Sequence, residues 1–568
     1  MRTRRGRLGA GGRPRGGSHP GRPHSDEPHP HGPHPDGDRP ARRPLPESGW
    51  VRGCAALLAG ALPALTFPAP SLWWLACVAL VPWLLLIRSA GTVRRAALDG
   101  WIGGTGFVFA VHHWLMPSLH VFIVLLAALL GLLWAPWGVL VGRLLGGRPS
   151  APRAAAAVVA VASGWLVIEL VRSWEGLGGP WGLLGASQWE VTPALRVASV
   201  GGVWLVSLLV VAVNTALVLL TTGRTTVRTT GGVLLVVCAL AVAGMWAWAP
   251  RPVTTGTARI AVVQPGVVSG PGSVERRLAR GEELTRTVAG RDVDLVVWGE
   301  SGIGAAAWRD PGTARRLAAL SRETGAALLV NVDARQTGGS GRSGIFKSAV
   351  LVGPEGPTGD RYDKMRLVPF GEYIPARSLL GWATSVGKAA GEDRLRGDRQ
   401  VVMALPDGDR RLRIGPLVCF ESAFPDMSRR LTRDGAQVLV AQSATSTFQE
   451  SWAPAQHASL GALRAAENGR PVVHATLTGI SAVYGPSGER IGKPLGTEAS
   501  AAAVYDLPLT RGSTLYGRFG DWAVYGALAA LAALCAAEGL RALRRRPAPG
   551  SPGRCARTAH GWPERPGR

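Results

Sequence analysis

Cys419 lies in "LVCFESAF", residues 417–424, directly after the short apolar run "RIGPLV". A cysteine thiolate is a strong nucleophile, yet free cysteine is also among the most often buried and least reactive residue types. The stretch alone leaves two interpretations open: a nucleophile, or a small core residue at the end of a strand.

Glu300 and Lys364 are further polar groups that we expect next to strand ends. Glu300 ends "DLVVWGE", and Lys364 lies in "RYDKMRLVPFGEYIP", residues 361–375. Sites in α/β proteins are often built on the loops that follow strand ends. Each residue also has an ordinary interpretation, because Glu300 could cap a turn or a helix and Lys364 could be a surface charge. Only the fold can bring the three residues together.

The region that carries these residues, 255–512, has the pattern of an α/β domain. Short apolar runs alternate with stretches of helical spacing that end at glycine. We predict strands at 259–265, 294–301, 327–334, 348–354, 412–420, 437–443, 471–477 and 481–486. We predict helices at 271–290, 312–325 and 453–470, and hairpin turns at 353–360 and 484–490.

The first half of the chain and a stretch near its end are apolar enough to lie in a membrane. Apolar runs occur at 52–67, 71–88, 99–117, 119–142, 154–171, 197–220, 231–249 and 521–540. Several approach the roughly 20 residues that span a bilayer, and many tryptophans lie near their ends. We therefore predict a multi-pass α-helical membrane domain of about seven helices at 50–250, and a C-terminal membrane helix at 520–541.

Positive charge alternates between the loops that join these runs. Arginine gathers in "RSAGTVRR", "GRLLGGRPSAPR", "TTGRTTVR" and "RALRRR", whereas the loops "FPAPS" and "MPSLH" carry no lysine or arginine. Basic loops stay on the cytoplasmic side of a membrane. We therefore expect both termini inside and the region 255–512 outside. The net charge of +25 then needs no nucleic acid as a partner.

The two ends of the chain have the composition of disordered tails. Residues 1–48 are rich in Arg, Pro and His, and residues 542–568 are basic. Segments with so few aliphatic residues cannot bury a core, so we predict disordered cytoplasmic tails at both ends. The 6 cysteines of the chain form no CxxC pattern and no metal-ligand spacing. The sequence therefore supports neither a zinc site nor a disulfide framework.

Three motifs resemble the Glu–Lys–Cys signature of the nitrilase superfamily, the carbon–nitrogen hydrolases: "VVWGES", "YDKMRLVPFGEYIP" and "GPLVCFESAFP". The motif "LVPFGEYIP" between membrane helices is more specific and is similar to the apolipoprotein N-acyltransferase family. The loop "GGPWGLLGASQ" (178–188) and the run at 200–218 are also similar to that family's loop and sixth helix. The resemblance covers roughly residues 50–540.

The resemblance implies a nitrilase-like αββα sandwich at 255–512, on the extracytoplasmic side of the plasma membrane and flanked by eight membrane helices. It implies transfer of a fatty acyl chain from a membrane phospholipid, through a cysteine thioester, to an apolipoprotein. The acceptor would be the N-terminal amino group of a diacylglyceryl-cysteine. The partners would be the phospholipid, the apolipoprotein and the bilayer, with no cofactor or metal required.

The motifs also imply roles for particular residues. Cys419 would be the nucleophile, Glu300 the general base and Lys364 the cation beside the oxyanion. Glu372, in "PFGEY", and Glu421, in "CFES", match further acidic positions near the family's site. These assignments come from the resemblance alone.

The chain departs from the family pattern at two places. The segment 442–452 carries Phe448 but lacks the usual Asn–Asp pair, and Lys347 stands where the family's "YNS" motif has asparagine. Candidates for an apolar entrance for lipid are 379–386 and 513–522, and the first could equally be an ordinary amphipathic helix. Two other functions stay open: a membrane-tethered amidase or nitrilase that passes the acyl group to water, and a non-catalytic paralogue.

Overall fold

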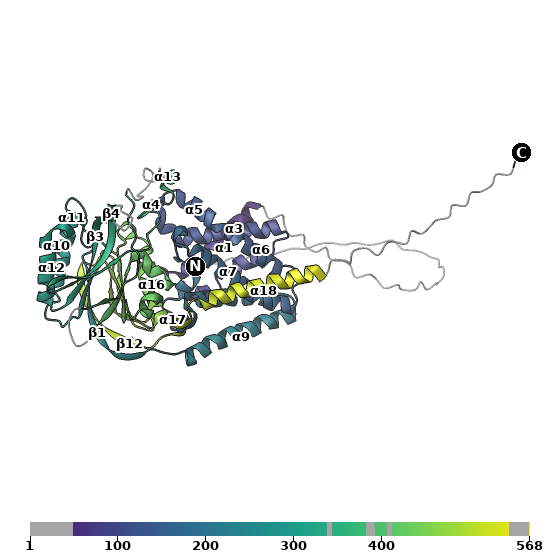
Figure 1. The fold of residues 1–568 in the computed structure, drawn as a ribbon. Helices are drawn as coiled ribbons and strands as arrows, with labels where there is room; N and C mark the ends of the chain where they lie inside the picture. Colours follow the sequence, from purple (N-terminus) through teal and green to yellow (C-terminus); the bar gives the residue numbers. More distant parts are fainter. Residues whose placement is uncertain (1–48, 338–342, 382–391, 406–411, 545–566, 568) are drawn as a thin grey trace, which may run out of the picture. The chain divides into compact units, whose positions relative to one another are not determined.

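The computed structural model describes residues 49–337, 343–381, 392–405, 412–544 and 567 (Figure 1). The tail predicted at 1–48, most of the tail predicted at 542–568 and most of the candidate entrance at 379–386 lie outside the described residues.

Helices occupy all the apolar runs of the first half of the chain (Figure 1). The longer ones are α1 (Gly49–Ala61), α2 (Val81–Arg88), α3 (Val93–His112), α5 (Phe122–Gly131), α6 (Trp134–Leu145), α7 (Ala151–Arg172), α8 (Thr192–Leu220) and α9 (Thr225–Trp248). Shorter helices include η1 (Leu62–Thr66), η2 (Trp73–Cys77), η3 (His113–Leu115) and α4 (Met116–Leu119). The last apolar run forms α18 (Trp522–Arg544), which extends beyond the predicted end at 541.

In the described part of the chain, 5 helical stretches are long and apolar enough to span a membrane: Gly49–Thr66, α7, α8, α9 and α18. Helices α5 and α6 meet the same test together but are bent by 42°. The apolar stretch Trp73–Arg88 is shorter, and α3 carries Arg94, Arg95 and Asp99. The eight spans that the family resemblance implies therefore stay a prediction.

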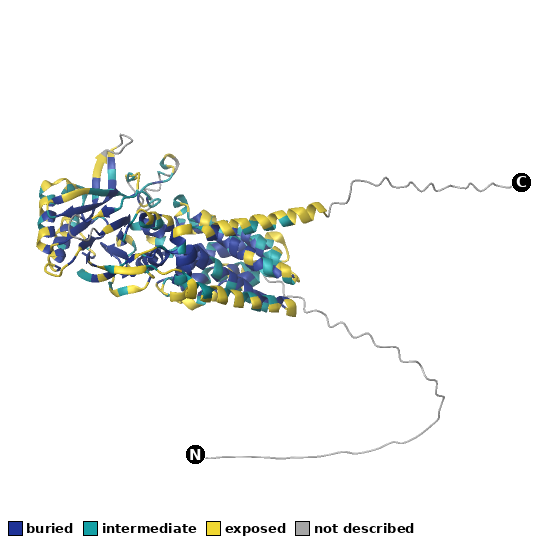
Figure 2. Ribbon diagram, turned by 60° about the horizontal axis from the view of Figure 1, so that its bottom comes forward, coloured by how far each residue is buried: buried dark blue, intermediate teal, exposed yellow. Residues whose placement is uncertain are grey.

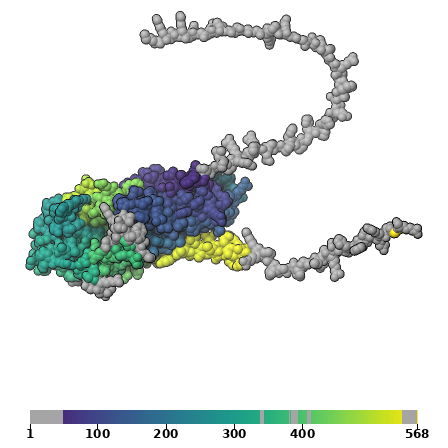
Figure 3. Space-filling view, turned by 90° about the horizontal axis from the view of Figure 1, so that it is seen from above, coloured from purple at the N-terminus to yellow at the C-terminus, as the bar shows by residue number. Residues whose placement is uncertain are grey.

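The outer helices expose apolar side chains, as a lipid-facing surface requires. Figure 3 shows α18, in yellow, on the outside of the helical part. Leu240 of α9 and Tyr525 of α18 are largely exposed. Figure 2 shows long exposed stretches on these helices, whereas α7 and α8 are mostly buried.

Two six-stranded sheets form the α/β part, in the orders β12-β1-β2-β3-β4-β5 and β11-β10-β9-β8-β7-β6. The strands of the first sheet are β1 (Val253–Gln264), β2 (Leu295–Trp298), β3 (Ala327–Thr337), β4 (Ser343–Gly353), β5 (Gly356–Asp363) and β12 (Ala501–Arg511). Those of the second are β6 (Met403–Ala404), β7 (Arg413–Val418), β8 (Val438–Ser443), β9 (Val472–Thr476), β10 (Ser481–Tyr484) and β11 (Arg490–Leu495).

All the predicted strands are confirmed, and so are both hairpin turns, which join β4 to β5 and β10 to β11. The strands that the sequence did not predict are β5, β6, β11 and β12. Each of them is an edge strand of its sheet. An edge strand needs fewer buried side chains than a central one, so its sequence lacks a long apolar run.

The sheets and helices stack in the order of an αββα sandwich. One core lies between the sheets and includes Ile260, Leu295, Ile414 and Val438. The outer face of the first sheet packs against α10 (Ser273–Arg286) and α12 (Pro311–Thr324). The outer face of the second packs against α15 (Pro425–Arg433) and α16 (Ala453–Asn468). Shorter helices are α11 (Ala305–Arg309), α13 (Arg377–Leu380) and α17 (Leu515–Phe519).

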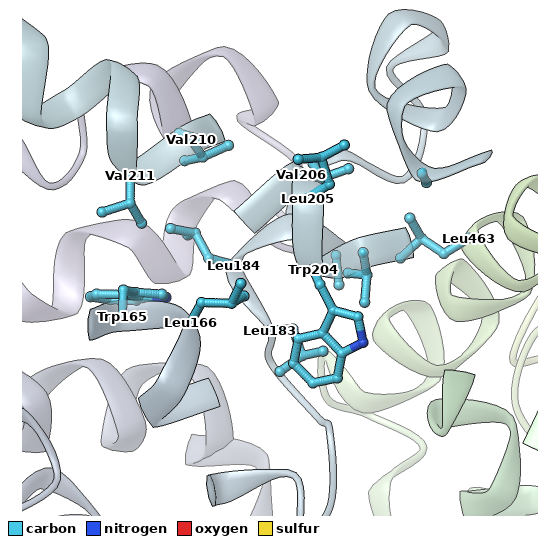
Figure 4. Packing of buried hydrophobic residues seen from close by; sticks show 14 of the residues in the cluster. Trp165, Leu166, Leu183, Leu184, Trp204, Leu205, Val206, Val210, Val211 and Leu463 are labelled. Carbon is cyan, nitrogen blue, oxygen red and sulfur yellow. The ribbon is translucent and has the colours of Figure 1, made fainter. Parts of the chain in front are cut away.

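The layer of α15 and α16 shares one hydrophobic core with the membrane-type helices. Figure 4 shows Leu463 of α16 near Trp204 of α8 within this core. The indole nitrogen of Trp181, in the loop after α7, donates to Oε1 of Gln456 in α16 at 2.9 Å. The α/β part is therefore packed against the helical part rather than only tethered to it by the chain.

Helix α8 is interrupted where it meets this layer. Gly202 has φ of 70°, a left-handed conformation that favours glycine, and a Cβ there would overlap the ring of Tyr516. The second half of α8 then begins at Val203, whose N–H donates to Oε1 of Glu467 at 2.8 Å. A carboxylate at a helix start satisfies an otherwise unpaired N–H group and is favoured by the helix dipole.

We expect Glu467→Ala to destabilise the junction strongly. Glu467 is buried and also pairs with buried Arg464 at 2.8 Å, so the alanine variant leaves a buried cation without its partner. The expected loss is about 3 kcal/mol of the free energy of unfolding. Glu467→Gln keeps an acceptor for the Val203 N–H, and we expect it to lose clearly less. Equilibrium unfolding in detergent micelles measures both, with exposed Glu498→Ala as the control. Equal losses in the alanine and glutamine variants would contradict the capping role.

Candidate active site

Glu300, Lys364 and Cys419 follow strands that end at the same edge of the sandwich. In the first sheet, β2 and β3 are parallel, β4 reverses and β5 reverses again, so β2 and β5 run the same way. Lys364 directly follows β5, and Glu300 comes two residues after β2. In the second sheet, Cys419 directly follows β7, which is parallel to β8.

Hydrogen bonds join the two sheets at this edge. The N–H of Glu300 donates to the carbonyl of Ser443 at 3.1 Å, and the side-chain amide of Gln442 donates to the carbonyl of Trp298 at 2.9 Å. A Cβ on Gly299 would overlap the backbone of Thr476 and Leu477, so glycine permits this close approach. Glu300 is thereby held at the contact between the two sheets.

Lys364 is an ammonium group in the interior and not a surface charge. Its side chain is 1% exposed, and Nζ lies 3.2 Å from Oε1 of Glu300 and 2.8 Å from Oε1 of Glu372. Burial alone would lower the pKa of Lys364, but the two carboxylates raise it well above its ordinary value. The group therefore stays charged at any physiological pH.

Glu372 completes this ion-pair cluster. Its second oxygen, Oε2, accepts from the N–H of Val368 at 2.8 Å, which fixes the carboxylate within the turn that follows Lys364.

Burial favours the neutral form of Glu300, but Lys347 and Lys364 lower the pKa of Glu300 to about 2. Both Glu300 and Lys364 are therefore ionised in the resting site.

Cys419 opens the short helix η6 (Cys419–Ala423) with φ of 53°, a conformation that non-glycine residues rarely adopt. Strain of this kind is concentrated at functional sites. The side chain is partly exposed, whereas most of its neighbours in η6 are buried. Burial and the charge of Glu300 raise the pKa of Cys419 to about 12, and Lys364 acts in the opposite direction. The resting thiol is therefore protonated.

The Glu421 carboxylate accepts hydrogen bonds from backbone N–H groups around the site and is not part of the ion-pair cluster. Its Oε1 accepts from the hydroxyl of Tyr362 at 2.7 Å and from the N–H groups of Met365 at 2.7 Å and Arg366 at 3.1 Å. Its Oε2 accepts from the N–H of Val418 at 2.8 Å. Glu421 thereby ties the segment after Lys364 to the strand that ends at Cys419.

The sequence did not identify two other residues at the site. His457 of α16 has Nε2 3.1 Å from the carbonyl oxygen of Cys419, and burial lowers the pKa of His457 to about 4, so the ring is neutral. Lys347 of β4, noted only as a departure from the family pattern, has Nζ 3.2 Å from Oε1 of Glu300. No sequence signal marked His457 or the contact of Lys347 with Glu300, because both depend on how distant elements pack.

The two segments with unassigned roles both pack against the helical part. In 442–452, the ring of Phe448 lies 5.0 Å from that of Trp114, and Trp452 lies 4.5 Å from His113. The segment 513–522 contains α17, whose Tyr516 is buried against the break in α8. Their roles in a substrate pocket or a lipid entrance stay predictions.

We expect Glu421→Gln to destabilise the protein by about 2 kcal/mol, because an amide nitrogen in place of either oxygen would face an N–H donor. Tyr362→Phe removes only one donor and leaves the carboxylate bound to backbone N–H groups. The expected loss for this matched variant is below about 1 kcal/mol. Equilibrium unfolding in micelles measures both. Losses of equal size would contradict the positioning role of Glu421.

Comparisons with known proteins identify the family. A model described as carbon-nitrogen hydrolase matches residues 259–514, and one described as apolipoprotein N-acyltransferase N-terminal domain matches residues 59–216. A solved amidase from Nesterenkonia sp. is 20% identical, covers 47% of this chain and 94% of its own, and has a TM-score of 0.32.

Relatives named apolipoprotein N-acyltransferase match most of the chain. The protein of Pseudomonas syringae pv. tomato is 29% identical over 467 residues, which are 78% of this chain and 88% of that protein. The protein of Geobacter metallireducens is 31% identical over 494 residues, which are 84% of this chain and 92% of that protein. Because such a match spans both the apolar helices and the αββα sandwich, the chain belongs to the apolipoprotein N-acyltransferase family.

Proposed function

We propose that this enzyme transfers a fatty acyl chain from a membrane phospholipid to the N-terminal amino group of a diacylglyceryl-cysteine in apolipoproteins. The observation that carries the proposal is the buried ion-pair cluster of Glu300, Lys364 and Glu372, whose charges act on Cys419. This cluster occurs in a chain whose relatives are named apolipoprotein N-acyltransferase.

In the first half-reaction, Cys419 is the nucleophile and Glu300 the base. The thiol is protonated at rest, so its proton moves to Glu300 while sulfur attacks the ester carbonyl of the phospholipid. The ammonium of Lys364 donates to the oxyanion of the tetrahedral intermediate. The C–O bond then breaks, the proton passes from Glu300 to the departing lysophospholipid, and a thioester remains on Cys419.

In the second half-reaction, the amine of the apolipoprotein attacks this thioester. Glu300 takes a proton from the attacking amine, Lys364 again binds the oxyanion, and the C–S bond breaks to give an amide. The proton returns to sulfur and restores the thiol. The acyl group thus passes through the enzyme in a ping-pong scheme that needs no diffusible cofactor.

The junction between the membrane-type helices and the α/β part suits lipid-anchored substrates. A cavity of about 440 Å³ lies at this junction. Apolar side chains of Leu170, Trp174 and Phe424 line it together with charged Arg366 and Asp426. Such mixed lining suits a lipid with a polar headgroup.

We also propose, from the alternation of basic loops, that the α/β domain is extracytoplasmic and that both termini are cytoplasmic.

We expect the purified enzyme, incubated with phospholipid and no acceptor, to gain the mass of one fatty acyl chain on Cys419. Intact-mass and peptide mass spectrometry measure the adduct, and Cys419→Ala should give none. An adduct that persists in Cys419→Ala would remove Cys419 from the mechanism. Release of ammonia from small amides, without any phospholipid adduct, would favour the amidase. An enzyme inert in both assays would favour the non-catalytic paralogue.

We expect Lys364→Met to slow formation of this adduct by about 100-fold, because the oxyanion loses a charged donor. Exposed Lys493 on β11 offers a matched lysine-to-methionine control, Lys493→Met, which should keep the original rate. Single-turnover acylation with phospholipid measures both variants. Full retention of the rate in Lys364→Met would exclude Lys364 as the oxyanion donor.

A further inference from the structure

Lys347 is a second cation at the site, and the mechanism above does not use it. We propose that Lys347 is a positioning residue whose ammonium group holds the Glu300 carboxylate ionised and offsets its negative charge beside Cys419. The inference rests on the proposed roles of Glu300 and Cys419. It goes beyond them because it assigns a role to Lys347, which takes no part in either half-reaction.

The side chain of Lys347 is aimed at the site by its place in the first sheet. Strand β4 pairs Lys347 with Asp333 of β3, next to the edge where β2 ends. Its Nζ lies 3.2 Å from Oε1 of Glu300, 2.8 Å from the hydroxyl oxygen of Ser301 and 3.9 Å from Oδ1 of Asp333. The side chain is 15% exposed, so these contacts replace most of its contact with water.

The two lysines approach the same carboxylate oxygen. Nζ of Lys364 also lies 3.2 Å from Oε1 of Glu300, and the backbone N–H of Lys364 donates to the carbonyl of Lys347 at 2.9 Å. Two ammonium groups at one oxygen hold the carboxylate in a single orientation, because a rotation would break both contacts. Ser301 strengthens this arrangement, since it accepts from Lys347 and donates to Asp333 at 3.0 Å.

The charges around Cys419 show why a second cation matters. Without Lys347, the buried ion-pair cluster has the carboxylates of Glu300 and Glu372 against the single ammonium of Lys364. A thiolate would add a further negative charge to a site that is already negative. Lys347 balances the cluster, and like charges so close together are costly in a dry interior.

Other titratable groups face the site from the neighbouring elements. Asp333 faces it from β3, and Glu421 of η6 lies close enough to interact electrostatically with Lys364. His457 faces it from α16 and is neutral, since burial lowers its pKa to about 4. None of these groups replaces the positive charge of Lys347. The additional carboxylates increase the need for it.

The electrostatic effects on each group agree with this geometry. Burial would raise the pKa of Glu300, and Lys347 is foremost among the charges that lower it, to about 2. Burial and Glu300 raise the pKa of Cys419, and both lysines act against that rise. Loss of Lys347 should therefore move the titration of both groups to higher pH.

The rate at which iodoacetamide alkylates Cys419 tests this inference, because only the thiolate reacts. Mass spectrometry of the Cys419 peptide separates it from the other cysteines. We expect Lys347→Gln to react about tenfold more slowly at each pH from about 7 to about 10, which is a displacement of about one pH unit. The logarithm of the rate should keep its slope against pH, because the same group titrates. Lys347→Asn, which removes the same charge with a shorter side chain, should behave in the same way.

Arg335→Gln is the matched control. Arg335 lies on β3, is exposed, and pairs with Glu392 at 2.8 Å, so the variant removes one exposed positive charge from the same sheet. We expect its alkylation rate to equal that of the unchanged enzyme. An unchanged or faster rate in both Lys347 variants, or an equal slowing in Arg335→Gln, would overturn the inference. Alkylation needs no phospholipid, so failure of the acyl adduct alone would instead count against the proposed function.

Discussion

The site depends on a buried ammonium group that cannot lose its charge. Lys364 is 1% exposed, and a charge in such a place is very costly unless opposite charges surround it. Glu300 and Glu372 supply them; the Glu372 carboxylate is held by the N–H of Val368, and the Glu300 carboxylate also pairs with Lys347. Two strand ends, the contact between the sheets and the turn after β5 are therefore arranged around one cation.

A shared hydrophobic core and a helix cap link the α/β part to the membrane-type helices. Cys419 opens η6, and the layer that follows it, α15 and α16, shares its core with those helices. Glu467 of α16 caps the second half of the broken helix α8 through Val203. A site built in this way stays at a fixed place relative to the apolar surface. This fixed position agrees with the lipid-anchored substrates that we propose.

Much of this architecture could be predicted from the sequence, because central strands need long apolar runs. The four edge strands could not be predicted, since β5, β6, β11 and β12 are short or partly exposed. Predicted strand ends marked Glu300 and Cys419, whereas Lys364 follows β5, which was not predicted; the motif resemblance supplied the proposed roles of all three. Contacts that depend on pairing between distant strands or on packing of α16 could not be read from the chain. The contact of Lys347 with Glu300 is one such case.

We propose that Lys364 binds the oxygen of the acyl group carried by Cys419. An experimental structure of the enzyme, trapped with phospholipid in the absence of an acceptor, tests it most directly. We expect density for an acyl chain on the sulfur of Cys419, with the thioester oxygen within hydrogen-bond distance of Nζ of Lys364. An acyl group on another residue, or a thioester oxygen directed away from Lys364, would contradict it.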